Sequence, residues 1–276
     1  MIIIDKEKCT GCGLCASDCL LGEIRLVDGR AQEANQVCYD CGHCVAICPE
    51  GAICPQKGED QILEYDPSLF AIDSERLLNM IRFRRSIRHY KEKKIPREVL
   101  EKALEGGMYA PTGRNSQSVR YVVAEKEKDM LVREALSTLN QLSEEILSDP
   151  GEAKITKLYA KMWQDLYHSY REEGRDGLFY GAPAAVLVIA SQKKSPSTAE
   201  IDGAIAAANI ELMANTLGLG TCYCGFFNRA FSRNRALQEF AGLKAGEILV
   251  TSFAIGYPAV SYYRTTARRK DKITWR

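Results

Sequence analysis

Two short cysteine-rich stretches, CTGCGLCASDC at residues 9–19 and CYDCGHCVAICP at residues 38–49, decide how the first part of this chain folds. Each contains four cysteines with the spacing C-x2-C-x2-C-x3-C, and the second stretch begins 29 residues after the first. This repetition indicates an internal duplication. Three cysteines spaced by two residues let one tight loop surround most of a metal cluster, whereas the fourth ligand has to come from elsewhere. The segment is therefore predicted to bind metal clusters.

The spacing matches that of bacterial ferredoxins with two [4Fe–4S] clusters, in which the fourth cysteine of each run binds the other cluster. We therefore assign Cys9, Cys12, Cys15 and Cys48 to one cluster, and Cys38, Cys41, Cys44 and Cys19 to the other. A pair of zinc sites also uses Cys-x2-Cys pairs, but it does not require eight cysteines in this duplicated order. Cys54 also precedes a proline and could compete with Cys48, although we expect Cys54 to be a small buried residue.

Around these runs, the sequence predicts a small domain and a boundary. Residues 23–33, EIRLVDGRAQE, predict a β-hairpin that turns at Asp28 and Gly29. Residues 1–60 resemble a bacterial two-cluster ferredoxin domain over their whole length. The polar, turn-rich residues 61–73 are predicted to be a linker, and residues 74–276 a second domain.

The composition of the whole chain narrows the classes of partner. Its 276 residues include 37 Lys and Arg against 36 Asp and Glu, which gives no electrostatic reason to bind nucleic acid or an anionic membrane. The longest apolar run, residues 182–190, is far shorter than a membrane-spanning helix. The first residues lack a secretory signal, so we expect a cytoplasmic protein. Small molecules or other proteins are the expected partners.

The second domain alternates helical and strand patterns. Ser74 is expected to cap a first helix, Pro96 to open a second, and Gly218 to close a helix over residues 200–217. Further amphipathic patterns predict helices over 127–148 and 153–173, and apolar runs predict strands over 119–124, 184–190 and 248–255. Such a mixture indicates an α/β or α+β layered domain.

Several short motifs of this domain could bind a phosphorylated, planar ligand. In RRSIR at residues 84–88, Arg84, Ser86 and Arg88 alternate, so an extended backbone would place them on one face, where they suit a phosphate. The loop APTGRNSQ at 110–117 is rich in hydrogen-bonding groups and precedes a strand. Small residues in LGLGTCYCGFF at 217–227 would allow a ligand to approach the backbone closely. AIGYP at 254–258 ends a strand before a basic tail.

In this order, and together with GAPAAVLVI at 181–189 and DGAIAAANIELMANTLGLGTC at 202–222, these motifs resemble the nitroreductase family of FMN enzymes. The resemblance covers residues 74–276. It implies an α+β fold, with a central mixed sheet wrapped by helices and preceded by the ferredoxin-like domain. The whole chain resembles ferredoxin–nitroreductase fusions of anaerobic bacteria.

The resemblance also implies roles for individual residues. Arg84, Ser86 and Arg88 would contact the FMN phosphate, ribityl chain and ring edge, with Arg88 near the pyrimidine end. A second group would complete the cofactor site, namely the loop residues Pro111, Thr112, Asn115 and Gln117, the backbone amides of Cys224 and Gly225, and one or both of the tail residues Arg268 and Arg269. Many members carry Glu where this chain has Cys224, which removes a side-chain role but not a backbone contact.

The family further implies a homodimer in which both chains contribute to each FMN pocket. The expected activity is the reduction of nitroaromatic compounds, quinones or similar electrophilic small molecules by an FMN-dependent oxidoreductase fed through two [4Fe–4S] clusters. A one-electron donor such as ferredoxin, or NAD(P)H, would supply the electrons. Two alternatives stay open, namely a redox partner protein without its own small-molecule substrate, and a specialised member such as a reductive dehalogenase.

Overall fold

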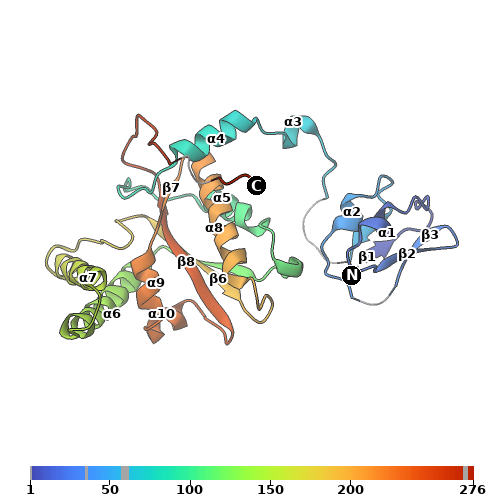
Figure 1. Cartoon of the computed structure of the whole chain (residues 1–276). Coiled ribbons are helices and arrows are strands. Elements are labelled where there is room, and N and C mark those ends of the chain that lie inside the picture. The colour runs from blue at the N-terminus through green and yellow to red at the C-terminus, as the bar shows by residue number, and fades with distance from the viewer. Residues whose placement is uncertain (1, 35–36, 57–61, 270–272) are drawn as a thin grey trace. The chain divides into compact units, whose positions relative to one another are not determined.

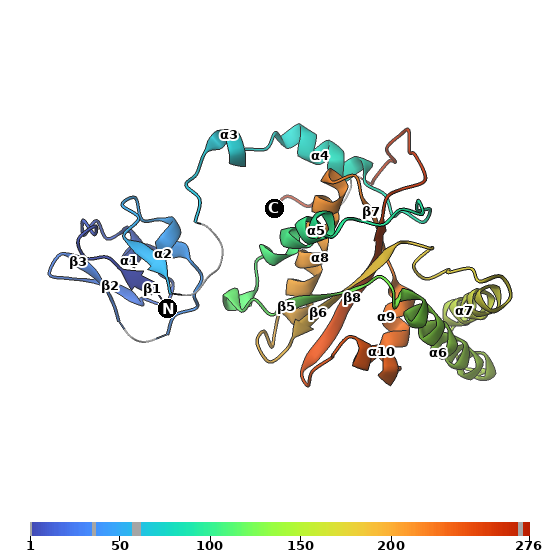
Figure 2. The ribbon, with the colours of Figure 1, turned by 180° about the vertical axis from the view of Figure 1, so that it is seen from behind.

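The computed structural model describes residues 2–34, 37–56, 62–269 and 273–276. They form two compact units, one that comprises Met1–Ala71 and Arg114–Ser116, and a larger one that comprises Ile72–Gly113 and Gln117–Arg276. The ribbon of the chain is drawn in Figure 1 and, from behind, in Figure 2. The first residue of the predicted linker, 61, lies outside the described residues, and Pro67–Phe70 within that linker forms helix α3.

Unit 1 shows the duplication that the cysteine spacing predicts. Each cysteine loop leads into a short helix that begins after a left-handed glycine, Gly13 (φ 78°) before α1 and Gly42 (φ 76°) before α2. A side chain would be strained at both positions because φ is positive there. Two antiparallel strand pairs accompany the helices, and their elements are β1 (Ile2–Ile4), α1 (Leu14–Asp18), β2 (Ile24–Val27), β3 (Arg30–Glu33), α2 (His43–Ala46) and β4 (Ile53–Pro55).

Two expectations for unit 1 have opposite outcomes. The hairpin is confirmed, because β2 and β3 pair antiparallel around Asp28 and Gly29, which both have positive φ. The expectation that Cys54 is buried is wrong. Cys54 lies opposite Ile3 in the β1–β4 pair, and neighbouring strand residues point to opposite faces. Ile53 therefore takes the buried position, and Cys54 is exposed.

The sheet of unit 2 has four strands in the order β5–β6–β8–β7. All of its strand pairs are antiparallel, so the prediction of a mixed sheet is wrong for the described residues. The reason lies in the strand order: β6 and β7 run in the same direction, but β8 separates them. The strands, predicted to within one residue where a strand was predicted, are β5 (Val119–Ala124), β6 (Ala184–Ser191), β7 (Gly220–Tyr223) and β8 (Glu247–Gly256).

Helices cover both faces of this sheet, as Figures 1 and 2 show. Alternate side chains of β6 enter two separate cores: Val186 and Val188 pack with α5 and α8, whereas Leu187 and Ile189 pack with α6 and α9. The α+β fold class is therefore confirmed. The helices of unit 2 are α4 (Ser74–Phe83), α5 (Arg97–Met108), α6 (Lys128–Ser148), α7 (Lys154–Glu173), α8 (Ala199–Thr216), α9 (Gly225–Phe231) and α10 (Arg235–Phe240).

The ends of two helices follow from local chemistry. Gly218, with φ 73°, lies just past the end of α8, as predicted for a left-handed residue that closes a helix. The capping residue of α4 is Asp73 rather than Ser74, because the Asp73 carboxylate accepts a hydrogen bond of 2.8 Å from the N–H of Arg76. Aspartate and serine are both good N-caps, so sequence alone gives the position only to within one residue.

Close packing of α5 against α8 depends on Gly107. A Cβ atom there would lie 2.5 Å from the Tyr121 hydroxyl oxygen and 2.7 Å from the side chain of Ile210. The Tyr121 hydroxyl is buried and has no hydrogen-bond partner among the described residues. Gly107 therefore lets β5 and α8 approach α5 closely.

We predict that Gly107→Ala destabilises the protein, although alanine is the better helix former by about 1 kcal/mol. Overpacking of this kind costs about 1–3 kcal/mol and should outweigh that gain. Adding Tyr121→Phe should recover part of the loss, because it removes the closest atom. The free energy of unfolding, measured by urea denaturation, checks this, with Gly106→Ala as a milder control. A Gly107→Ala variant more stable than the parent protein would contradict the packing argument.

Candidate functional site

Four of the predicted ligand cysteines line one cavity of unit 1. The pocket is lined by Cys9, Cys12, Cys15 and Cys48, so three cysteines of the first run meet the last cysteine of the second. This is the grouping assigned from the spacing. Four sulfur atoms around one concave site fit the ligand set of a [4Fe–4S] cluster.

Backbone N–H groups point at two of these sulfur atoms. The Ala31 N–H donates to Cys9 Sγ at 3.4 Å, and the Ala52 N–H donates to Cys48 Sγ at 3.3 Å. The first of these bonds lowers the pKa of the Cys9 thiol, whereas burial raises the pKa of Cys15. Hydrogen bonds to ligand sulfurs stabilise the thiolate form and tune the potential of a bound cluster.

The second cysteine group is more open to solvent. Cys41 is exposed, whereas Cys38 and Cys44 are half-buried, and Cys44 lies close enough to both for their charges to affect its pKa. Burial raises the pKa of Cys44 to about 11. Cys19 accepts a hydrogen bond of 3.2 Å from the N–H of Glu23, and its assignment to this group stays a prediction.

In unit 2, residues 84–88 run along the free edge of β7. The Ile87 N–H donates to the Thr221 carbonyl oxygen at 2.9 Å, which fixes the segment to the strand. A Cβ at Gly220 would collide with Ile87, so this approach requires a residue without a side chain. Ser86 lies half-buried between the arginines.

The alternation predicted that Arg84 and Arg88 lie on one face, and the structure contradicts this prediction. Arg84 forms an ion pair of 2.9 Å with Glu211 of α8, and Glu211 also accepts a hydrogen bond from the Thr221 hydroxyl. The Arg88 guanidinium instead lies 5.8 Å from the ring centre of Tyr180, next to Cys222. The side chains of Thr221 and Cys222 point to opposite faces of the sheet, so the two arginines also reach opposite faces.

Arg85, which is not among the predicted site residues, connects this segment to the basic tail. Its guanidinium donates to the Thr266 hydroxyl at 3.3 Å, and Arg268 donates to the same oxygen at 3.0 Å. Two cations therefore converge on one acceptor, near a pocket that is lined by Arg84, Arg85 and Glu211. Both Arg268 and Arg269 are exposed, and Arg268 is the one that shares the Thr266 hydroxyl with Arg85.

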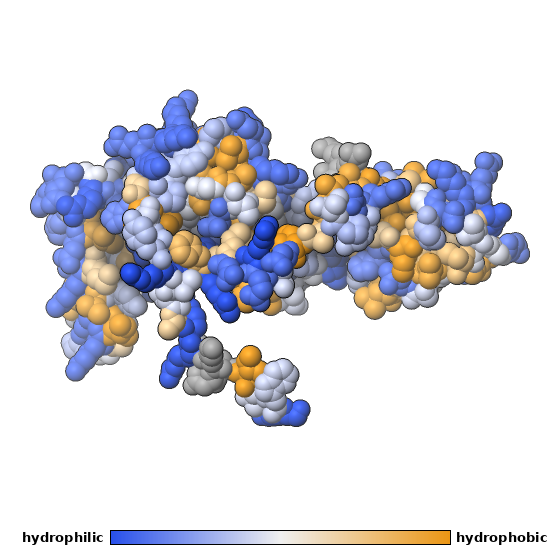
Figure 3. All heavy atoms as spheres, turned by 90° about the horizontal axis from the view of Figure 1, so that it is seen from above, coloured by the Kyte–Doolittle hydropathy of each residue, from blue (hydrophilic) through white to orange (hydrophobic). Residues whose placement is uncertain are grey.

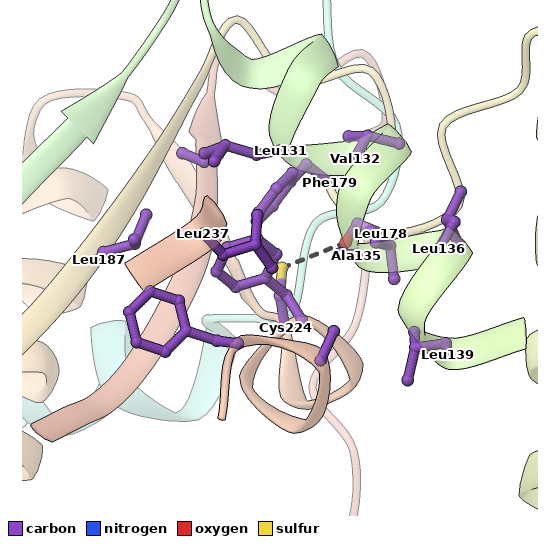
Figure 4. Close-up of a cluster of buried hydrophobic side chains, with 14 of the residues drawn as sticks. Leu131, Val132, Ala135, Leu136, Leu139, Leu178, Phe179, Leu187, Cys224 and Leu237 are labelled. Atoms are coloured by element: carbon purple, nitrogen blue, oxygen red, sulfur yellow. Dashed lines mark hydrogen bonds between the residues drawn. The ribbon is translucent and has the colours of Figure 1, made fainter. Parts of the chain in front are cut away.

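The expected backbone contact of Cys224 is wrong. Its N–H donates to the Ser252 carbonyl at 2.9 Å, so β8 uses the group that was assigned to a ligand. The Cys224 side chain is buried, and its thiol lies 3.2 Å from the Leu178 carbonyl (Figure 4). Burial strongly raises the pKa of this thiol, which therefore stays protonated. Gly225 is exposed, with open space where a Cβ would be.

The loop that contains Pro111, Thr112, Asn115 and Gln117 is closed by a hydrogen bond of 3.0 Å from the Gln117 N–H to the Thr112 hydroxyl. Pro111 and Gln117 are exposed, and Thr112 and Asn115 are half-buried. Asn115 and Gln117 have positive φ values of 50° and 44°, which residues other than glycine adopt rarely. Positive φ at non-glycine residues is common where a loop is shaped for a function.

A buried carboxylate anchors this loop. Asp202, only 3% exposed, accepts hydrogen bonds from the Gly113 N–H (3.1 Å) and from the hydroxyls of Ser118 (3.2 Å), Ser195 (2.7 Å) and Thr198 (3.3 Å). The sequence gives little sign of this role, because an acidic residue in the first turn of a helix is ordinary.

The loop and the arginine segment lie at different ends of α8. Asp202 holds the loop near the start of the helix, whereas Glu211 holds Arg84 nine residues further along, which is roughly 13–14 Å at the rise of an α-helix. A single chain therefore does not bring the two halves of the predicted FMN site into contact through these anchors.

Comparison with known proteins agrees with this arrangement of elements. Residues 81–257 match the nitroreductase family. The chain belongs to the nitroreductase family. Residues 1–49 match a 4Fe-4S dicluster domain, so this is a nitroreductase-family oxidoreductase with an N-terminal ferredoxin domain. Among the residues that the structure describes, no helix is both long and apolar enough to span a membrane.

Individual relatives of this nitroreductase-family chain have low sequence identity to it but match it over about two thirds of its length or more. A protein of Archaeoglobus fulgidus, named as a candidate NADH dehydrogenase/NAD(P)H nitroreductase, is 28% identical over 67% of this chain and 86% of its own length. A 4-nitrobenzoate reductase of Nocardioides is 24% identical over 69% of this chain and 82% of its own. The crystal structure of a nitroreductase with bound FMN from Desulfitobacterium hafniense is 25% identical, with a TM-score of 0.54, over 72% of this chain and 97% of that one.

We predict that Asp202→Ala releases the loop. Each donor that loses its buried acceptor costs about 1–3 kcal/mol, so hydrogen exchange at the Gly113 amide should accelerate at least about fivefold. Exchange mass spectrometry of peptides that cover residues 110–118 checks this. Glu200→Ala, an exposed carboxylate of the same helical turn, is the matched control. Equal exchange in both variants would show that Asp202 does not anchor the loop.

Proposed function

We propose that this chain is an FMN-dependent oxidoreductase that receives electrons through two [4Fe–4S] clusters and reduces nitroaromatic compounds, quinones or similar electrophiles. The convergence of Arg85 and Arg268 on one hydroxyl, beside the Arg84 pocket, carries the proposal. Guanidinium groups gathered in this way repel one another unless an anion such as a phosphate monoester joins them.

The cysteines of unit 1 would hold the clusters. One cluster would be bound by the four cysteines that line the cavity, Cys9, Cys12, Cys15 and Cys48. The other cluster would be bound by Cys38, Cys41, Cys44 and Cys19. Each cluster carries one electron at a time. The more exposed second group is the natural entry for electrons from an external one-electron donor, because its sulfur atoms lie closest to solvent.

The residues along the edge of β7 would hold FMN, which supplies hydride or single-electron chemistry when bound. Arg84, Arg85 and Arg268 would bind its phosphate, and Arg88 would lie beside its ring. Gly225 would face the ring through its backbone, whereas Cys224 would not, because its N–H is already paired. The structure with bound FMN from Desulfitobacterium hafniense supports this choice of cofactor.

The relatives support the choice of donor and acceptor. The name of the Archaeoglobus protein includes NADH dehydrogenase and NAD(P)H nitroreductase, and that of the Nocardioides protein includes 4-nitrobenzoate. We therefore propose NAD(P)H as a second electron donor beside a ferredoxin-like protein, and a nitro-substituted aromatic compound among the acceptors.

We further propose a homodimer in which each FMN contacts both chains. One support is the separation of the loop from the arginine segment along α8, since the partner's loop could complete the site. Another is the apolar surface that a single chain leaves exposed on α4, at Leu77, Leu78, Ile81 and Phe83, and on α7, at Ile155 and Leu158. Apolar side chains over the α6–α7 hairpin are visible at the left of Figure 3. Exposed apolar patches of this extent are typical of interfaces.

An anaerobic assay tests the proposed function. The protein is reduced with a ferredoxin or with NAD(P)H and then mixed with a nitroaromatic compound or a quinone. We expect acceptor reduction, and about eight irons per chain by metal analysis. Cys12→Ser should impair the ferredoxin-fed reaction more than the NAD(P)H-fed one. Electron transfer to a protein without consumption of either acceptor would favour a redox partner role, and stoichiometric zinc would contradict the cluster assignment.

Mixed dimers test the shared FMN site. One chain carries Arg84→Ala with Arg88→Ala, and the other carries Asn115→Ala with Gln117→Ala; both homodimers should lose FMN because each lacks half of every site. A mixed dimer purified through two different tags should retain about one FMN, since the symmetric interface then leaves one site intact. A mixed dimer without FMN would show instead that each site is built within one chain.

A further inference from the structure

The segment from Asp176 to Gly181, between α7 and β6, is held by a buried carboxylate. Asp176 accepts hydrogen bonds from the N–H groups of Leu178 (3.0 Å), Phe179 (2.8 Å) and Gly181 (3.2 Å). The ammonium group of Lys128 lies 3.2 Å from the same carboxylate, and both side chains are about nine-tenths buried. A charge removed from water in this way needs such partners, so the turn has one well-defined conformation.

Two side chains fix the segment from the other side. Phe179 is fully buried, and its ring centre lies 5.0 Å from that of Phe227 in α9. Leu178 is buried beside it, and its carbonyl lies 3.2 Å from the Cys224 thiol, as Figure 4 shows. The segment is therefore packed against the turn that precedes α9, next to Gly225.

Tyr180 has a strained backbone between these anchors. Its φ is 58°, a left-handed value that is a genuine outlier for a bulky side chain. Strain of this kind persists only where the surroundings fix the conformation, and it gathers at functional sites. The consequence is that the phenol ring projects toward Arg88, with the guanidinium carbon 5.8 Å from the ring centre. That distance is within the range of a cation–π interaction.

We propose that Tyr180 is a positioning residue of the flavin site, which holds the Arg88 guanidinium at the edge of β7 in the orientation that favours the reduced cofactor. The inference rests on the proposed function, since it assumes that FMN lies beside Arg88. A hydrogen bond with the Tyr180 hydroxyl also raises the pKa of Arg88, so both the ring and the hydroxyl favour the cation at this place.

The physical reason is the flexibility of arginine. A free Arg88 side chain would sample many rotamers, and its charge would be spread over a large volume of solvent. A partner that is itself rigid selects one position before the ligand arrives, which is preorganisation. The reduced flavin carries negative charge near its pyrimidine ring, so a fixed cation there stabilises the reduced form more than the oxidised form.

The test measures the midpoint potential of FMN bound to the cluster-loaded protein. It also measures the affinities of the flavin-free, cluster-loaded protein for oxidised and for reduced FMN. Tyr180→Phe removes the hydroxyl and keeps the ring, whereas Tyr180→Asn removes both and is compatible with a left-handed backbone. We expect Tyr180→Asn to weaken reduced relative to oxidised binding about tenfold, a fall of about 30 mV in the two-electron potential. The potential of the Tyr180→Phe variant should lie between those of Tyr180→Asn and the parent protein.

Two controls separate positioning from stability. In an Arg88→Gln background, Tyr180→Asn should have no further effect on the potential, because Tyr180 acts through Arg88. Tyr121→Phe, which removes a hydroxyl without a partner in the α5–α8 core, should leave the potential unchanged. Thermal melting is recorded for every variant.

The inference is overturned if both Tyr180 variants keep the parent potential, even where the melting temperature falls, or if Tyr180→Asn lowers the potential equally without Arg88. Failure of the proposed function is a different result: the parent protein would then bind no FMN or reduce no acceptor. An unchanged potential in FMN-loaded Tyr180 variants therefore refutes the positioning role alone.

Discussion

The hydrogen bond of 2.9 Å from the Ile87 N–H to the Thr221 carbonyl is the interaction on which the candidate site of unit 2 depends. β7 is an edge strand whose other side pairs with β8, so its free edge offers a backbone acceptor. Once residues 84–88 are attached there, Arg84 reaches Glu211 on one face and Arg88 reaches Tyr180 on the other. Gly220 makes this attachment possible because a side chain would occupy the place of Ile87.

Two buried carboxylates prepare the loops on either side of the sheet. Asp202 joins the Gly113 N–H to three hydroxyl groups, and Asp176 joins three backbone N–H groups of residues 178–181 to Lys128. Each carboxylate accepts hydrogen bonds from several groups of its loop, and these bonds both stabilise the buried charge and fix the loop. Both loops contain positive φ at residues with side chains, so the energy that the carboxylates contribute offsets local backbone strain. This arrangement produces rigid polar surfaces from segments without regular secondary structure.

Sequence patterns predicted the elements of this chain better than the contacts between them. Apolar periodicity located the strands and the long helices closely, and the cysteine spacing grouped Cys48 with the first run. The direction of strand pairing escaped prediction, because periodicity within a strand carries no information about which strand becomes its neighbour. The alternation of Arg84 and Arg88 was present in the sequence, but their partners, Glu211 and Tyr180, are distant in the chain and decided where the side chains lie.

Some residues of the candidate site could not be predicted from the sequence, because their contribution depends on backbone conformation rather than on residue type. Nothing in the letters of residues 176–181 distinguishes Tyr180 from an ordinary loop tyrosine, and its role depends on a φ of 58° that only the folded surroundings impose. The same holds for Cys224, whose N–H is taken by Ser252 because β8 extends far enough to pair with it. With that donor withdrawn, fewer backbone groups remain at the start of α9 to face a flavin ring. Recognition of the ring would then depend more on the cation of Arg88, and hence on whatever holds that cation in place.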